Sequence, residues 1–175
     1  MALPDYFKWG QGTPIVWGEA GASGVTNTLS LDALANGSGR MGAAVDLGPL
    51  WDQNFLAILW AETGTAPTAG NLVELYLAWS HDNTNWPGKV TGLDAAYPAT
   101  VAANKLQLGL PAVTLKATND ATTVLKQNPV KIRPKARYVA PVVINMLGLA
   151  LRDEATATDN GSRAILVPLL SSIED

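Results

Sequence analysis

Residues 71–80 read NLVELYLAWS, and this stretch decides the fold class. Side chains in a β-strand alternate between its two faces, so one face carries Leu72, Glu74 and Tyr76. The opposite face is uniformly apolar and is made of Val73, Leu75, Leu77 and Trp79. An apolar alternation bounded by turn residues predicts a strand that packs against a core.

Similar runs lie on both sides of this strand. Residues 54–62 (NFLAILWAE) form another apolar run, and residues 63–70 (TGTAPTAG) read as a hairpin-like connection between the two. Further strands are predicted within residues 25–34, 39–48, 105–115, 122–127, 130–148 and 163–170. Helices are expected only as short pieces, around residues 31–36 and 99–105, because neither segment has a long apolar stripe of period 3.6.

Proline and turn residues punctuate the apolar runs. Pro111, Pro134, Pro141 and Pro168 interrupt them, which suits edge strands, bulges or strand ends. Many short strands closed by Gly, Asn and Pro turns are typical of an antiparallel sandwich or barrel. The sequence therefore predicts an all-β protein whose residues 23–175 form a single antiparallel, jelly-roll-like β-sandwich.

The N-terminal segment, residues 1–22, is predicted to be an extended aromatic arm. Tyr6, Phe7, Trp9 and Trp17 are 4 of the 12 aromatic residues, and glycines and prolines between them disfavour a helix or a long strand. Burial of one such side chain is worth on the order of 2 kcal/mol. We expect these aromatics to be buried, either against the protein's own sandwich or, preferably, against a neighbouring subunit.

The composition favours association over free solution. A chain of 175 residues can bury a sizeable core, and it has no cysteine for disulfides or thiolate sites. Charged residues are only 15% of the chain, which weakens the repulsion between copies. The net charge of −3 argues against nucleic-acid binding. The sequence contains neither an apolar span of about 20 residues nor a recognisable signal peptide, so we expect neither membrane insertion nor secretion.

The chain has few residues of the types that serve in catalytic or metal-binding sites. His81 is the only histidine and opens a turn in which Asp82 and the asparagines after it fit Asx-turn chemistry. The acids within residues 153–159 (Asp153, Glu154 and Asp159) lie in a small polar stretch that reads as a solvated loop. No phosphate-binding glycine motif is present. The sequence predicts no enzyme, no metal site and no cofactor.

The most distinctive feature of the charge distribution is a cluster of basic residues within residues 116–137. Residues 116–137 hold six of the twelve basic residues and a single acid, Asp120. Four of them recur at every second position, so in an extended segment they point the same way: Lys131, Arg133, Lys135 and Arg137. They form either the solvated face of an edge strand, kept positive against aggregation, or a docking stripe for an acidic partner.

The remaining aromatics divide into two groups. Trp60, Tyr76 and Trp79 sit within strand runs and are expected in the core. Loop residues flank the others, which are Trp51, Trp86 and Tyr97. Exposed aromatics on a β-sandwich can stack sugars, so a carbohydrate-binding module is a competing interpretation.

Several phrases in the chain resemble small virion structural proteins of tailed bacteriophages. They are Arg40-Met41-Gly42 with Asp46-Leu47-Gly48, the run VELYLAWSHDNTNWPG, and Arg137-Tyr138-Val139 within ARYVAPVVINMLG, in order over roughly residues 24–170. The resemblance implies a β-sandwich in the particle, such as a capsid decoration (cement) protein, or alternatively a tail or head-tail component. It implies no catalytic residue.

The resulting functional hypothesis is a non-enzymatic subunit of the virion, assembled in the host cytoplasm. Its implied partners are the major capsid protein or other virion subunits, with homo-oligomers, including trimers, expected on such a lattice. The residues predicted to bind partners are Tyr6, Phe7, Trp9, Trp17, Lys131, Arg133, Lys135 and Arg137. A carbohydrate-binding module and a hydrolase that uses His81 or Asp153 are the rival hypotheses.

Overall fold

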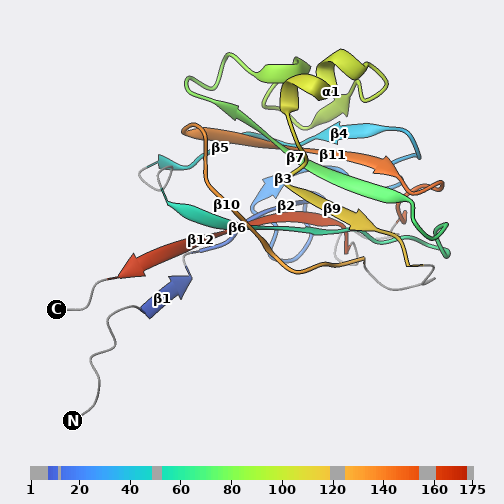
Figure 1. Ribbon diagram of the computed structural model, residues 1–175, viewed down its shortest axis with the longest axis horizontal. Helices are drawn as coiled ribbons and strands as arrows, with labels where there is room; N and C mark the ends of the chain where they lie inside the picture. Colours follow the sequence, from blue (N-terminus) through green and yellow to red (C-terminus); the bar gives the residue numbers. More distant parts are fainter. Residues whose placement is uncertain (1–7, 12, 49–52, 119–124, 154–160, 173–175) are drawn as a thin grey trace, which may run out of the picture.

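The protein is a two-sheet β-sandwich, as the sequence predicts (Figure 1). The computed structural model describes residues 8–11, 13–48, 53–118, 125–153 and 161–172. Strand pairs in both sheets are antiparallel, apart from the parallel pair β2–β3. The jelly-roll connection pattern remains a prediction.

The first sheet has the order β10-β6-β12-β2-β3, and β1 pairs with the far end of β12. Its strands are β1 (Lys8–Gln11), β2 (Ile15–Gly18), β3 (Asn27–Thr28), β6 (Asn54–Trp60), β10 (Val130–Ile132) and β12 (Arg163–Ser172). The second sheet has the order β8-β4-β11-β7-β9, and β5 also pairs with β11. Its strands are β4 (Gly39–Met41), β5 (Val45–Asp46), β7 (Leu72–Ser80), β8 (Ala95–Tyr97), β9 (Val113–Lys116) and β11 (Tyr138–Met146).

The main core lies between the two sheets and follows the alternation of β6 and β7. Phe55 and Leu59 point inward from β6, and Val73 and Leu75 point inward from β7. The opposite face of the second sheet is covered by a third layer, formed by the 3₁₀ turn η2 (Pro87–Lys89) and the helix α1 (Ala102–Leu108). A second apolar cluster fills this interface, and it includes Tyr76 from the outer face of β7. The predicted division of faces along residues 71–80 is confirmed.

The predicted hairpin over residues 63–70 is wrong. β6 pairs with β10 and β12 in the first sheet, whereas β7 pairs with β11 and β9 in the second sheet. The segment between them therefore crosses from one sheet to the other. Two strands that each have one apolar face can bury those faces either as a hairpin in one sheet or by packing face to face from two sheets. β6 and β7 adopt the second arrangement, and their apolar faces form the core.

Two predicted runs contain more than one element. Residues 105–115 split into the end of α1, which buries Leu108, and the strand β9. Residues 130–148 split into β10 and β11 with an irregular connection between them. Of the two helix candidates, the one around residues 99–105 contains most of α1, whereas residues 31–36 form turns.

Pro141 occupies the middle of β11, a strand with neighbours on both sides, which differs from the predicted edge or strand-end position. Pro141 lies opposite Leu77 of β7, and its carbonyl accepts a hydrogen bond from the Gly42 N–H at 2.9 Å. The pairing of β4 begins one residue later, at Val142. Pro141 therefore lies at a position where its missing N–H removes no hydrogen bond between paired strands.

The N-terminal segment follows β12 in its own molecule. Gln11 pairs with Leu169 and Ile15 pairs with Leu166, so four steps along the arm match three steps along β12. β2 lies between β12 and β3. Residues 15–18 of the predicted arm are therefore part of the first sheet.

Candidate interaction surface

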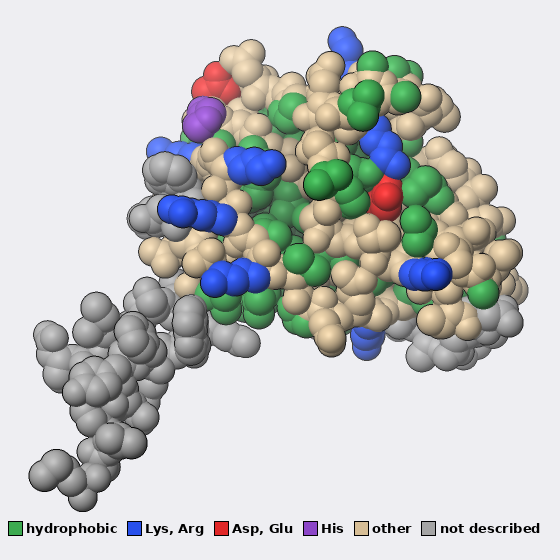
Figure 2. Space-filling view, in the orientation of Figure 1, with side chains coloured by type: hydrophobic (Ala, Val, Ile, Leu, Met, Phe, Trp, Pro, Cys, Tyr) green, Lys and Arg blue, Asp and Glu red, His purple; other side chains and the backbone are tan. Residues whose placement is uncertain are grey.

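Two adjacent pockets share one exposed leucine, Leu110, and we call them together the Leu110 groove. The first has a volume of about 220 Å³ and is lined by Leu77, Trp79, Leu108, Leu110, Ala112, Ile132, Arg133 and Lys135. The second has a volume of about 280 Å³ and is lined by Tyr76, Ala102, Lys105, Leu106, Gly109, Leu110 and Pro111. Leu110 is 91% exposed and Leu106 is 79% exposed. The groove is thus an apolar surface open to solvent, and Figure 2 shows apolar side chains in a hollow flanked by Lys and Arg.

The first pocket forms where three segments end or turn. The end of β7 supplies Leu77 and Trp79, the connection from α1 to β9 supplies Leu110, and the connection from β10 to β11 supplies Arg133 and Lys135. Gly109, with φ at 81°, ends α1 in the left-handed region that favours glycine. Leu110 follows directly and projects into solvent.

One edge of β7 is open beside the first pocket. β9 pairs with β7 only as far as Leu75, whose carbonyl accepts a hydrogen bond from Ala112 N at 2.7 Å. Backbone groups alternate sides along a strand, so the N–H and C=O of Leu77 and Trp79 point to the same side as those of Leu75. Among the described residues, no strand continues along this edge beyond Leu75.

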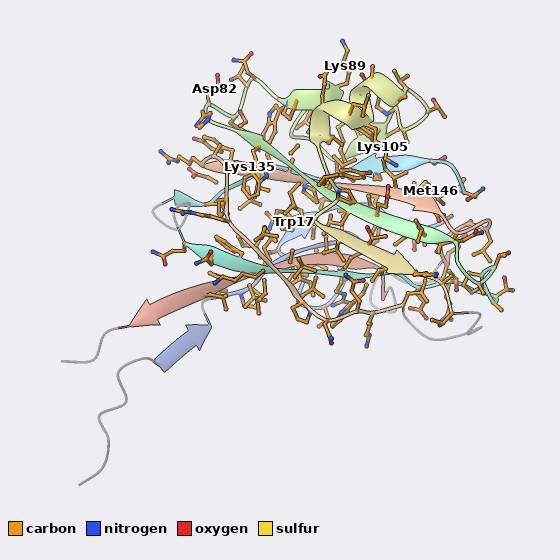
Figure 3. The ribbon with its side chains drawn as sticks, in the orientation of Figure 1. Trp17, Asp82, Lys89, Lys105, Lys135 and Met146 are labelled. Atoms are coloured by element: carbon orange, nitrogen blue, oxygen red, sulfur yellow. The ribbon has the colours of Figure 1, made fainter. Side chains whose placement is uncertain are left out.

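The predicted basic stripe is divided by the fold. All four side chains are exposed and alternate with half-buried or buried neighbours, yet only Lys131 lies on a strand, the edge strand β10. Arg133 and Lys135 line the first pocket. Arg137 instead bonds Asp46 at 2.6 Å, and this hydrogen bond lowers the pKa of the Asp46 carboxyl. The cations that remain beside an apolar pocket are therefore Arg133 and Lys135, and Figure 3 shows Lys135 on one side of the groove.

The charge beside the second pocket is neutralised locally. Lys105 Nζ lies 2.7 Å from Glu74 Oε2, and the Tyr76 hydroxyl donates to the same carboxylate at 2.7 Å. Burial lowers the pKa of Lys105, but its hydrogen bonds with Glu74 and Tyr76 outweigh burial and raise it. This lysine holds α1 against β7. The first pocket is thus the better candidate for recognising an acidic group.

The predicted partner-binding aromatics have different fates. Trp17 is fully buried in the main core, and its indole N–H donates to the Ala43 carbonyl at 2.7 Å. The prediction that Trp17 contacts a partner is wrong, because the sandwich itself buries this side chain. Trp9 belongs to β1, paired with Ser171 of β12. Tyr6 and Phe7 lie outside the described residues.

The candidate catalytic and metal-binding residues do not come together in a site among the described residues. His81 is exposed, and the Asp82 carboxylate accepts hydrogen bonds from the N–H groups of Asn85 and Thr84, which lower its pKa. This is the predicted Asx-turn arrangement. Among the described residues, no group of three or more His, Cys, Asp or Glu is placed to hold a metal ion. Asp153 is exposed, whereas Glu154 and Asp159 lie outside the described residues.

The loop aromatics do not form an open platform in the described part of the chain. Tyr97 is buried against the second apolar cluster, and Trp86 is half-buried beside it. Trp51 lies outside the described residues. Sequence reasoning missed Leu110 and the open edge of β7, because the exposure of a leucine and the length of a neighbouring strand depend on tertiary packing.

No protein-family model matches the chain, and no curated protein or solved structure matches it either. None of the helices formed by the described residues has the length and hydropathy that crossing a bilayer requires.

Proposed function

We propose that the protein is a non-enzymatic structural subunit of a bacteriophage virion, a capsid decoration protein that binds the head shell. The observation that carries the proposal is the ribbon formed by β1 and the end of β12, which leaves the body of the sandwich (Figure 1). β6 accompanies β12 only as far as Leu169, so β1 is the one described strand that pairs with residues 170–172.

An isolated two-stranded ribbon is at best marginally stable in water. A ribbon that projects from a sandwich is therefore suited to insertion beside another subunit, where its free backbone edge gains hydrogen bonds from a neighbouring sheet. The low charge of the chain and the exposed Leu110 groove support the same assembly role. The proposed partner is the major capsid protein, and the proposed location is the virion.

The test is co-sedimentation with purified heads that lack this protein. Three chains are compared: the full chain, a chain that starts at Lys8 and keeps β1, and a chain that starts at Thr13 and lacks it. Circular dichroism checks that all three have the same fold. We expect saturable binding at a fixed ratio to the capsid subunit for the first two chains, and a loss of at least tenfold in affinity for the third.

Two outcomes contradict the proposal in different ways. If no chain binds heads, the decoration role is wrong, and the same chains are then tested on tails and head-tail connectors. If all three chains bind heads equally, the decoration role stands but the ribbon is not its anchor.

A further inference from the structure

We propose that the first pocket of the Leu110 groove binds residues 173–175 (Ile173, Glu174 and Asp175) of a second copy of this chain. The bound segment lies as an extended strand against the open edge of β7. This inference concerns contacts between copies, goes beyond the proposed function and does not depend on it.

The backbone of the pocket offers pairing groups that bond no other described residue. Leu77 and Trp79 direct their N–H and C=O groups toward the side of β7 that β9 leaves open. Pro141 supports this assignment, because it faces Leu77 from β11 and has no N–H to exchange with it. Two alternate residues whose donors and acceptors have no partner among the described residues can hold a short extended segment by β-augmentation.

The pocket is built for one apolar side chain beside a negative charge. Its volume of about 220 Å³ is enclosed largely by leucine, tryptophan, alanine and isoleucine side chains. Arg133 and Lys135 complete the lining, and neither makes an ion pair with a described residue. A ligand that fits both features carries an apolar residue and, close to it on the same face, a carboxylate.

The segment that follows β12 has this chemistry. In an extended chain, Ile173 and Asp175 share one face and lie about 7 Å apart along the strand. Ile173 then enters the pocket while Asp175 meets the cations, and Glu174 adds a second negative charge. The net charge of these three residues complements that of Arg133 and Lys135.

The direction of β12 favours a second copy as the donor. The end of β12 is held by β1 in a ribbon that leaves the body of the sandwich, so β12 points outward from its own molecule where it ends (Figure 1). A contact of segment to groove joins two different surfaces. Such a contact is heterologous and closes into a ring when the rotation between copies permits it.

The test measures self-association and peptide binding with the full chain. Sedimentation velocity follows the oligomer for the wild-type chain, for Ile173→Ser, and for the double variants Arg133→Glu/Lys135→Glu and Glu174→Lys/Asp175→Lys. We expect a concentration-dependent oligomer for the wild-type chain and monomers for each variant. Combining the two double variants restores opposite charges, and we expect it to restore association.

A labelled peptide of residues 169–175 (LLSSIED) gives a second readout by fluorescence anisotropy. We expect it to bind the Ile173→Ser chain, whose own segment no longer competes, and to bind at least tenfold more weakly when Arg133→Glu/Lys135→Glu is added. Lys89→Glu is the matched control, because Lys89 is exposed and Figure 3 shows it away from Lys135. Lys89→Glu is expected to leave peptide binding unchanged.

The proposal is overturned if the Ile173→Ser chain associates like the wild-type chain, or if the peptide binds equally with and without the reversed charges. A monomeric wild-type chain that ignores the peptide also overturns it. Residues 1–11 are intact in all these variants, so head binding through the ribbon is tested separately and the two proposals can fail independently.

Discussion

Trp17 shows how a single residue decides where the N-terminal segment belongs. Its side chain is fully buried between the sheets, and its indole N–H finds an acceptor in Ala43. We expect Trp17→Ala to lower the free energy of unfolding by about 3–5 kcal/mol, because it removes a large core side chain and leaves a cavity. Urea denaturation measures this loss.

Trp86→Ala is the comparison for Trp17→Ala, since Trp86 is only half-buried. Its expected loss is smaller. Equal losses for the two variants would contradict the assignment of Trp17 to the core.

Asp94 joins three segments of the chain through its carboxylate. It accepts hydrogen bonds from Ser30 N at 3.1 Å, from Ser30 Oγ at 2.6 Å and from Arg40 Nε at 2.7 Å. Burial raises the pKa of Asp94, but the bonds from Arg40 and Ser30 outweigh burial and lower it. Because the folded pKa is depressed, this carboxylate contributes stability above its unfolded pKa of about 3.9 and loses the contribution as pH falls below that value.

We therefore expect Asp94→Asn to cost about 1–2 kcal/mol of unfolding free energy at pH 7. The difference from the wild-type chain should shrink as the pH is lowered from 4 toward 2. Urea denaturation at several pH values measures it, with the exposed Asp153→Asn as control. A difference that does not vary with pH would show that the charge of Asp94 is not what stabilises the fold.

At the scale of elements, Gly88 allows η2 to pack closely against α1. Its φ of 64° is left-handed, and a Cβ built there lies 2.6 Å from the backbone oxygen of Asn104 in α1. Gly109 also has a left-handed φ, of 81°, but a Cβ there meets nothing within 4 Å. A substitution strains the backbone at both positions, but only at Gly88 does the new side chain also meet a clash.

We expect Gly109→Ala to cost about 1 kcal/mol, from strain alone, and Gly88→Ala to cost roughly 2–4 kcal/mol. Hydrogen exchange should also quicken in α1 for Gly88→Ala, because the clash pushes the helix off η2. The close packing of η2 on α1 would be refuted by equal effects of the two substitutions.

The elements also show which parts of the structure can be predicted from the sequence. β7 is predicted because its inward residues, such as Val73 and Leu75, alternate strictly with outward ones. The partners of β7 are not predicted, because an apolar face fits a hairpin and a sandwich equally well. The basic residues were found by their spacing, but the bond between Arg137 and Asp46 joins positions 91 residues apart, which no local pattern reveals.

At the scale of the whole molecule, the chain divides its N-terminal segment between core and ribbon. β2 lies inside the first sheet, whereas β1 pairs only with the last residues of β12. The sandwich should therefore tolerate the loss of β1 but not the loss of β2. Chains that start at Thr13 and at Gly21 differ by the strand β2, which carries Trp17.

We expect the chain that starts at Thr13 to melt within a few degrees of the full chain. The chain that starts at Gly21 loses at least the 3–5 kcal/mol of Trp17, and for a protein of this size each kcal/mol shifts Tm by about 2–4 °C. Its Tm should therefore fall by about 10 °C or more, or the chain should fail to fold. Scanning calorimetry decides between these outcomes. If the two shortened chains melt together, well below the full chain, the ribbon is part of the cooperative unit, and a loss of head binding at Thr13 would then report unfolding instead of a missing anchor.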